Sequence, residues 1–396
     1  MARFCPEMKI STTVFSQVLA GLDATEVARA AALHPMRRAS RALSAYDHFA
    51  AMFFAQLTYR ESLRGIEACL LGRRAATYRM GIRGRVTRTN LAYANEHRDW
   101  RVFAAIAGVL MRRAQRLYGE TPPELGLDAD LFALDATVIE LSLALFPWAR
   151  WQKAQASVKL NVLLDVRNDL PVFASLHEGN RHEVASLDEI PVYPGCYYAI
   201  DRGYLDFRRH HRLHTAGAFF VTRLKAGIRY DVVASRRVDK IVGLRCDQTI
   251  RLSSAKGRTA YPEELRRVSY VDPETKQALV FLTNQFELAA LIIASIYRRR
   301  WAIELFFRWI KQHLRLRGFF SNSPNGVRVQ IWTALCAYLL VAIAKQQKNL
   351  APSMYEILQI VSASSFEQIP LPELLMKLDT SDGHIDIHNQ LEINYS

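Results

Sequence analysis

Residues 131–141 read LFALDATVIEL. Apolar and β-branched side chains fill most of its positions, which is typical of a β-strand buried on both faces. Asp135 lies in the middle of the run. A carboxylate inside such a strand is costly unless it is paired or binds a metal ion. The stretch therefore predicts the first strand of a buried sheet and a candidate site on that strand.

Further strands are predicted after this one from the same kind of pattern. They are Ser157–Val166, Pro171–His177, Tyr197–Ile200 and Ala218–Leu224. A hairpin-like turn at Asn168-Asp169 joins the first two of these, and helical stretches near 182–188 and 205–215 separate the others. The order of three strands, helix, strand, helix, strand predicts an α/β fold, with a mixed sheet and helices on both faces.

The chain on either side of this sheet has a different pattern. Residues from 10 to about 120 carry apolar side chains at helical spacing, and a polar loop at 118–128 follows them. Short β-like runs after 225 predict a β-rich insertion, and a long helix or helix pair resumes near Ala289. The predicted parts are an N-terminal helical domain at 1–120, the first part of the core at 128–225, the insertion at 226–284, the second part of the core at 285–350, and a helical segment with a polar tail at 351–396.

The charge of the chain favours a polyanionic partner. Lys and Arg total 52 against 38 acidic residues, which gives a net charge of +14. Six arginines and no acidic residue lie between Leu71 and Asn90, and seven basic residues and one acid lie between Tyr297 and Arg317. Such clusters are typical of phosphate contacts in nucleic-acid-binding proteins. The N-terminal helices and their arginine-rich turn are equally consistent with a DNA-binding unit and with a plain helical bundle.

The sequence argues against zinc, secretion and a membrane. The five cysteines are scattered without zinc-binding spacing, which favours a reducing, cytoplasmic compartment. The first residues lack the apolar run of a signal peptide. The most apolar stretch, Val329–Ala344, has 16 residues, and a buried helix is a better prediction than a membrane span.

A second carboxylate follows another predicted strand. Asp201 comes directly after Tyr197–Ile200. Carboxylates at strand ends in a mixed α/β sheet are typical of a functional site. Either Asp135 or Asp201 could instead cap a following helix, so each residue alone leaves a catalytic and a structural interpretation open.

The third candidate lies in YRRRWAIELFFRWIK, residues 297–311. At about 100° per residue, Tyr297, Arg300, Glu304 and Lys311 fall within roughly 60° on one helix face, and Arg308 extends the same stripe. The isoleucines of this segment gather on the opposite face. Glu304 could pair with the arginines four residues away on either side. Seven basic residues around one acid nevertheless exceed what charge balance needs, which favours a metal ligand beside a phosphate backbone.

The segment 297–311 resembles that of a known protein family. Tyr297-x₂-Arg300-x₃-Glu304-x₆-Lys311 is similar to the Y-(2)-R-(3)-E-(6)-K signature of transposases of the insertion-sequence-four family. The segments LDATVIEL and AIDRGYLDF resemble those that carry the family's two aspartates, and FFAQLTYRESLRGIEACL resembles the N-terminal helical domain of many relatives. The likeness extends from about residue 12 to about residue 370.

The resemblance implies a fold and a site. The fold is a ribonuclease-H-like core with a β-rich insertion and an N-terminal helical domain. The residues that hold the catalytic metals are Asp135, Asp201 and Glu304. Oxygen ligands select Mg²⁺ or Mn²⁺ over zinc, and two ions about 4 Å apart can clamp the attacking and leaving oxygens of a phosphoryl transfer.

The resemblance also implies partners. Tyr297, Arg300 and Lys311 would contact DNA at the transposon end. Arg308, Arg202 and Lys159 are further candidates for phosphate contacts, on the basic stripe and near the strand ends. The chain is therefore expected to bind terminal inverted repeats and target DNA, and to cleave and join strands as a homodimer in the bacterial cytoplasm, without a membrane.

Two positions depart from the family's usual pattern. Ala136 follows the first aspartate, where Ser or Thr is frequent, and Asn161 stands where many relatives have His. Neither supplies a required metal ligand. An active transposase, a non-mobile nuclease and an inactive DNA-binding remnant remain open, although loss of a carboxylate, as expected of a remnant, has not occurred.

Overall fold

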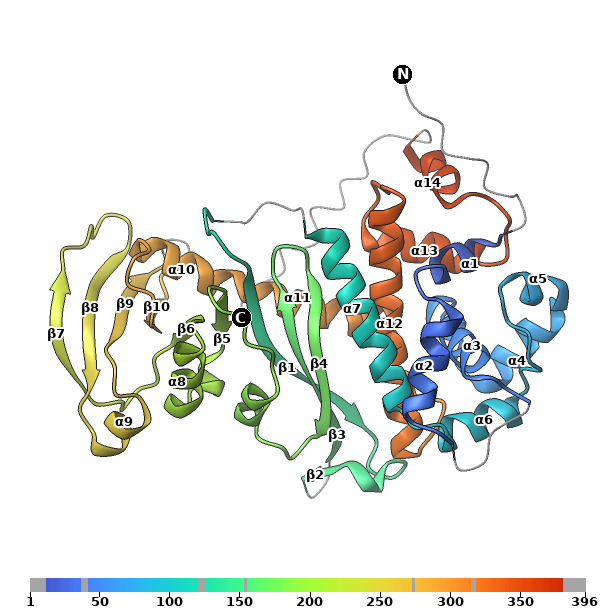
Figure 1. Ribbon diagram of the computed structural model, residues 1–396, viewed down its shortest axis with the longest axis horizontal. Helices are drawn as coiled ribbons and strands as arrows, with labels where there is room; N and C mark the ends of the chain where they lie inside the picture. Colours follow the sequence, from blue (N-terminus) through green and yellow to red (C-terminus); the bar gives the residue numbers. More distant parts are fainter. Residues whose placement is uncertain are drawn as a thin grey trace.

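The computed structural model describes residues 12–36, 42–119, 125–152, 155–272, 275–314 and 318–379. Ten strands in these ranges form one sheet, and most of the helices form a body beside it (Figure 1). The strands are β1 Leu131–Leu141, β2 Arg150–Gln152, β3 Gln155–Asp165, β4 Leu170–Glu178, β5 Tyr197–Ile200, β6 Phe219–Arg223, β7 Tyr230–Arg236, β8 Leu244–Leu252, β9 Leu265–Val271 and β10 Ala278–Thr283.

The middle of the sheet is built around β1. β3 pairs with β1 in the antiparallel direction, and β4 pairs with β3 in the same way. The turn between β3 and β4 contains Asp169, whose φ of 52° is one that Asp tolerates. On its other side β1 pairs in parallel with β5, and β5 in parallel with β6. The order β4-β3-β1-β5-β6 is the mixed, ribonuclease-H-like sheet that was expected.

Helices cover both faces of this sheet, as predicted. Successive side chains of β1 point to opposite faces, and each face packs against a different set of helices. Ala133 and Ile139 point into the larger core cluster, which also contains the apolar side of α11 (Trp301–His313). Phe132 and Leu134 point into a second cluster, with residues of η2 (Glu183–Asp188) and α8 (Phe207–Thr215). The apolar run of β1 therefore serves two separate cores.

The predicted insertion continues the same sheet. Its four β-like runs correspond to β7, β8, β9 and β10, and β10 pairs antiparallel with β6. The order from β6 outward is β10-β9-β8-β7, so the strand last in sequence lies nearest the core (Figure 1). The short helix α9 (Ala255–Ala260) was not predicted. Ser254 caps its N-terminus, and the hydroxyl of Ser254 accepts from Gly257 N–H.

A buried ion pair holds this extension to the rest of the chain. Arg266 on β9 donates through Nε and Nη2 to the two carboxylate oxygens of Asp247 on β8, both at 2.8 Å. Its Nη1 donates to carbonyl oxygens of the segment that leads to α10, including Leu288 O at 2.6 Å. Both side chains are almost fully buried, at 3% and 7% exposed. One guanidinium thus connects two strands to the start of the next helix.

The helical body is organised around α12 (Pro324–Gln347). Around it lie helices from the first 120 residues and from the C-terminal part (Figure 1). They are α1 Val14–Leu19, α2 Ala24–Leu33, α3 Ala45–Leu57, α4 Leu63–Gly72, α5 Arg74–Arg79, α6 Arg88–His97, α7 Arg101–Tyr118, α13 Met354–Ser364 and α14 Leu371–Asp379. α12 is long and apolar enough to cross a membrane, but 94% of its apolar window is buried inside the protein. It is the buried helix that was predicted.

The predicted segment 285–350 divides between these two parts of the molecule. α10 (Ala290–Arg299) and α11 lie along the sheet, whereas α12 packs in the helical body. Arg300 separates α10 from α11. At this point the backbone makes two hydrogen bonds between residues three apart: Arg300 N–H donates to Tyr297 O, and Ile303 N–H donates to Arg300 O. Such tight turns within a helix often mark a functional hinge or a strained segment. The polar tail from Ser381 onward lies outside the described residues.

Candidate active site

Parallel pairing brings two aspartates next to each other. Leu134 on β1 pairs with Ile200 on β5. Asp135 follows Leu134 and Asp201 follows Ile200, so the backbones of the two aspartates lie about 5 Å apart, the spacing of paired strands. Two carboxylates that are distant in sequence therefore meet where β5 ends.

The backbone fixes one oxygen of each aspartate. Ala136 N–H donates to Oδ1 of Asp135 at 2.8 Å. Gly203 N–H donates to Oδ2 of Asp201 at 2.9 Å, because Asp201 caps the short helix η3 (Arg202–Tyr204). The capping role that the sequence left open for Asp201 is thus real, and it fixes the position of Oδ2 of the carboxylate.

The remaining oxygens face the junction of α10 and α11. Tyr297 donates its hydroxyl to Oδ1 of Asp201 at 3.2 Å. Arg300 donates through Nη1 to Oδ2 of Asp135 at 3.2 Å and through Nη2 to Oε1 of Glu304 at 2.6 Å. The tight turn at Arg300 therefore presents Tyr297, Arg300 and Glu304 to the two aspartates, and the three predicted carboxylates form one group.

Burial controls the charge of the first aspartate. It raises the pKa of Asp135 to about 6, and the negative charges of Asp201 and Glu304 add to the rise. The hydrogen bond from Ala136 and the charge of Arg300 oppose it without cancelling it. Asp135 consequently holds a proton more readily than an ordinary aspartate does.

Asp201 shifts in the opposite direction. Burial would raise its pKa, but the N–H of Gly203 and the charge of Arg300 outweigh that effect and lower the pKa. Burial raises the pKa of the Tyr297 hydroxyl to about 12, so this group remains a hydrogen-bond donor at neutral pH. Neighbouring carboxylates with pKa values pushed apart are characteristic of catalytic sites.

The other predicted DNA contacts lie around this group at different depths. Arg202 is exposed beside Asp201, and Arg308 is exposed on α11. Lys311 lies partly exposed in the last turn of α11. Lys159 is different, because its ammonium is buried and bound to Glu183 Oε1 and Arg181 O, both at 3.1 Å. A phosphate contact by Lys159 would require that ion pair to open.

Glu183 is a neighbour of the site that the sequence analysis did not single out. A Cβ built on Gly203 would lie 3.4 Å from Oδ2 of Asp201 and 3.7 Å from Oε2 of Glu183, so both oxygens border the same open space. Glu183 lies in a short polar helical stretch, and nothing in that local pattern distinguishes it from a solvated acid. Only the tertiary packing of η2 against η3 brings it close.

The carboxylate oxygens of this site are suitable ligands for a divalent cation. Three carboxylates supply the oxygen ligands that Mg²⁺ and Mn²⁺ prefer, and the absent side chain of Gly203 leaves room beside Asp201. Among the described residues, no three ligating side chains converge closely enough to hold an ion as they stand. The guanidinium of Arg300 lies between Asp135 and Glu304 instead, so a cation there would displace it.

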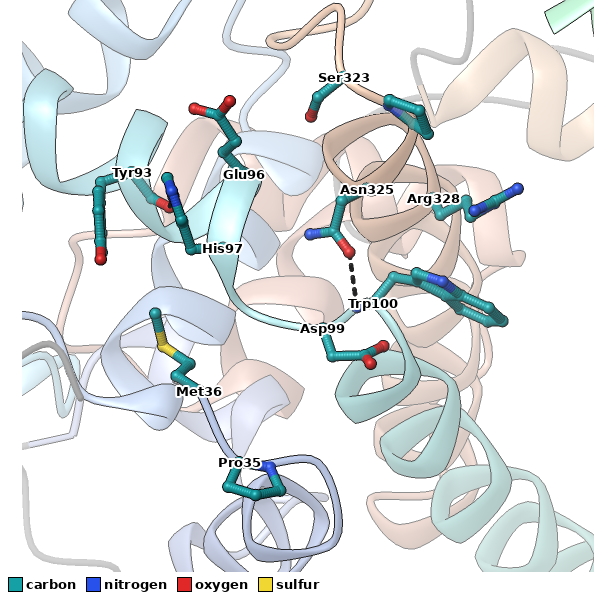
Figure 2. Close-up of a pocket in the computed structure, with 11 residues that line it drawn as sticks. Pro35, Met36, Tyr93, Glu96, His97, Asp99, Trp100, Ser323, Asn325 and Arg328 are labelled. Carbon is teal, nitrogen blue, oxygen red and sulfur yellow. Dashed lines mark hydrogen bonds between the residues drawn. The ribbon is translucent and has the colours of Figure 1, made fainter. Parts of the chain in front are cut away.

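A large cavity lies in the helical body instead. It has a volume of about 850 Å³, at the place where the end of α6 and the start of α7 meet the start of α12 (Figure 2). Asn325 accepts from Trp100 N–H at 3.1 Å there, and Tyr93 and His97 stack at 4.1 Å between ring centres. None of the three carboxylates lines this cavity. The candidate active site is therefore separate from this cavity.

Comparison with known families assigns most of the chain. Residues 126–340, more than half of the sequence, match the family described as the transposase DDE domain. Residues 11–83 match a domain of unknown function, DUF4372. The first match contains all three carboxylates and the second contains most of the arginine-rich turn.

Curated proteins similar to this chain are named as transposases. The protein y4zB of Sinorhizobium fredii is 34% identical over 282 residues, which cover 70% of this chain and 77% of y4zB. A transposase for insertion sequence element IS5377 from Geobacillus stearothermophilus is 29% identical over 247 residues, covering 59% and 63% of the two chains. One for element IS4SA from Synechocystis is 25% identical over 306 residues, covering 76% and 84%.

A solved structure is also similar. The piggyBac transposase in its synaptic complex with hairpin DNA matches with a TM-score of 0.45 and 9% sequence identity. The match covers 98% of this chain and 85% of the other.

Proposed function

Because the chain belongs to the DDE transposases of the insertion-sequence-four family, we propose that it binds the ends of its own element and cleaves and joins DNA there. The observation that carries the proposal is the meeting of Asp135, Asp201 and Glu304 around Arg300. Three acids from separate parts of the chain, one of them buried with a pKa raised to about 6, would not be placed together for stability alone.

The three carboxylates would hold Mg²⁺ or Mn²⁺. Bound divalent cations would activate the attacking hydroxyl and stabilise the charge that develops on the phosphate. The backbone N–H groups of Ala136 and Gly203 and the hydroxyl of Tyr297 keep the aspartates oriented. Asp135 must lose any proton it holds before it can ligate, so we expect cation affinity to rise with pH around 6.

Arg300 would exchange partners when the site is loaded. Its guanidinium bridges Asp135 and Glu304, and its Nε is buried without a hydrogen-bond partner. Once displaced from between the carboxylates, the arginine has a free fork of donors beside the place where a phosphate would lie. A planar guanidinium binds phosphate oxygens in pairs, which would fix the scissile group for in-line attack.

The reaction that these groups support is a pair of phosphoryl transfers. Water attacks the phosphodiester at the element's end, the P–O3′ bond breaks, and the products are a 3′-hydroxyl and a 5′-phosphate. The 3′-hydroxyl then attacks a phosphodiester of the target, so one P–O bond forms as another breaks. No covalent protein intermediate is needed. Joining two ends calls for two such sites, so we propose a homodimer on DNA.

Cleavage of the element's own end tests the proposal. A labelled duplex that carries the terminal inverted repeat is incubated with Mg²⁺ or Mn²⁺ and with wild type or Glu304→Ala. We expect the wild type to cut at the repeat boundary and to join the 3′-end to a second duplex, and the variant to bind the duplex without cutting it.

Each other outcome points to a different protein. Cleavage without joining would show a nuclease that uses the same site. Binding without cleavage by either protein would show a DNA-binding remnant. Cleavage by Glu304→Ala at the wild-type rate would remove the carboxylate group from the mechanism.

A further inference from the structure

A second basic site lies on the helical body. It is a pocket of about 540 Å³ between α5 and the loop that leads to α6. Arg74, Arg83 and Arg85 line it together with Tyr78, and no acidic residue does. α5 lies at the edge of the helical body that is remote from the sheet (Figure 1). The pocket is therefore separate from the three carboxylates.

Within the described residues, the arginine side chains around this pocket have no carboxylate partners. All six arginines of the cluster have exposed side chains, and no ion pair to an acid occurs for them in the described part of the chain. They are Arg73, Arg74, Arg79, Arg83, Arg85 and Arg88. Surface arginines of a soluble domain usually alternate with acids, so an unneutralised group of this size favours an anionic ligand.

An exposed aromatic ring completes the pocket. The side chain of Tyr78 is 61% exposed. The guanidinium of Arg83 lies 3.5 Å from the centre of its ring, and Nη1 of Arg83 donates to Tyr78 O at 3.1 Å. The contact holds Arg83 in one conformation while part of its donor fork remains free. A ring beside a fixed guanidinium provides an apolar surface for a sugar next to a donor for a phosphate.

The loop that carries Arg83 and Arg85 is held in place by the buried carboxylate of Asp47. Arg83 N–H donates to Oδ1 of buried Asp47 at 2.7 Å, and Ser44 donates to Oδ2 of the same carboxylate at 2.7 Å. Gly84 has no room for a side chain, because a Cβ there would lie 2.8 Å from Asp47 Oδ2 and 3.1 Å from Ala42 O. The loop is thus pressed onto a buried carboxylate, and the arginines on both sides of Gly84 are directed outward before any ligand binds.

The cavity of about 850 Å³ beside Trp100 offers a contrast. Its lining includes the acids Glu96 and Asp99 together with a single arginine, Arg328 (Figure 2). That mixture of charges does not suit a polyanion. The smaller pocket does, since all its charged groups are positive and its loop is already ordered.

We propose that this pocket, formed by Arg74, Arg83, Arg85 and Tyr78, holds the phosphodiester backbone of duplex DNA at a second place outside the active site. The proposal rests on the proposed function, and it assigns a role to the segment that matches the domain of unknown function. Arginine forks would bind phosphate oxygens, and Tyr78 would pack on the adjoining sugar. Such contacts position DNA without reading its sequence.

Salt-dependent binding tests the pocket directly. Affinity for the end duplex is measured in EDTA, without cleavage, for wild type and for Arg83→Ala/Arg85→Ala. Each lost phosphate contact lowers the slope of log affinity against log salt by about 0.9. We therefore expect the slope to fall by about 2 and affinity at 0.15 M salt to fall roughly 30-fold. The loss should be equal for an unrelated duplex of the same length.

Two further variants separate the pocket from general charge and from folding. Arg112→Ala/Arg116→Ala removes two exposed arginines from α7 and should leave the slope nearly unchanged. Arg83→Lys/Arg85→Lys keeps the charge and should retain most of the slope while losing part of the affinity, because lysine has no planar fork. Melting temperatures should stay within a few degrees of wild type, since the backbone bond to Asp47 is kept.

The outcomes distinguish this proposal from the proposed function. If Arg83→Ala/Arg85→Ala binds duplex DNA as wild type does, or if the α7 variant loses as much affinity, the pocket does not bind DNA. A loss confined to the pocket variant, in a protein that never cuts the end, would retain the pocket and remove the transposition chemistry. A wild type that binds no duplex would overturn both.

Discussion

Asp135→Asn should abolish DNA cleavage and at the same time make the metal-free protein more stable. The amide has the shape of the carboxylate, and its one oxygen can still accept from Ala136 N–H, while its NH2 group takes the place of the oxygen that accepts from Arg300. It lacks the negative charge that a divalent cation requires. Losing several kcal/mol of transition-state stabilisation corresponds to a decrease in rate of about 10³-fold or more.

The gain in stability follows from the pKa of Asp135. Burial raises it from 3.8 to about 6, so the folded protein holds this proton more tightly than the unfolded chain does. Stability from this group is complete below 3.8 and is lost as the pH rises through 6. At pH 8 the ionised carboxylate destabilises the fold by about 3 kcal/mol, on the order of 1.4 kcal/mol per pKa unit. Asn carries no such penalty.

Two measurements check this result. Cleavage of the end duplex is followed in Mg²⁺, and the melting temperature is measured in EDTA at pH 8 and at pH 4. We expect the melting temperature of Asp135→Asn to exceed that of wild type by several degrees at pH 8 and to approach it at pH 4. Asp231→Asn, an exposed position on β7, should change neither quantity. A variant that is both inactive and less stable at pH 8 would contradict the electrostatic explanation.

Arg266→Met should destabilise the extension of the sheet by about 3–5 kcal/mol, the range for breaking a buried ion pair from one side. The change leaves the carboxylate of Asp247 buried, and the more exposed Arg236 is then its one charged partner among the residues that the structure describes. It also removes the donor for Leu288 O before α10. Methionine fills a similar volume, so the loss reports the charge and the hydrogen bonds rather than a cavity.

Urea unfolding, with limited proteolysis of residues 226–284, measures the effect. The matched control is Arg251→Met, because Arg251 pairs with Glu264 at 2.8 Å in the same sheet but is 55% exposed. That exposed pair should contribute about 0–1 kcal/mol. Equal effects of the two substitutions would show that the buried pair does not hold the extension to the core.

Local patterns in the sequence were sufficient for the strands of the core. The apolar run around Asp135 and the short apolar stretch before Asp201 predicted β1 and β5 with their observed bounds, because strands buried on two faces have few polar positions. The helical spacing of Tyr297, Arg300 and Glu304 placed those side chains on one face, and the structure presents all three to the aspartates.

Features that depend on contacts distant in sequence were not predicted. The four strands of the insertion were recognised, but their continuation of the core sheet depends on pairing between β10 and β6. Glu183 carries no local signal, and neither does the contact between Asp47 and the loop at Gly84. In each case the partner comes from another part of the chain.

Asp201→Cys tests whether the aspartates bind the catalytic cations. A thiolate is a poor ligand for Mg²⁺ and a better one for softer cations such as Zn²⁺. We predict that Asp201→Cys does not cleave the end duplex in Mg²⁺ but regains cleavage when Mn²⁺ or Zn²⁺ is supplied, while Asp201→Ala regains none. Cleavage by Asp201→Cys in Mg²⁺ at the wild-type rate, or equal recovery by the cysteine and alanine variants, would contradict a metal-binding role for Asp201.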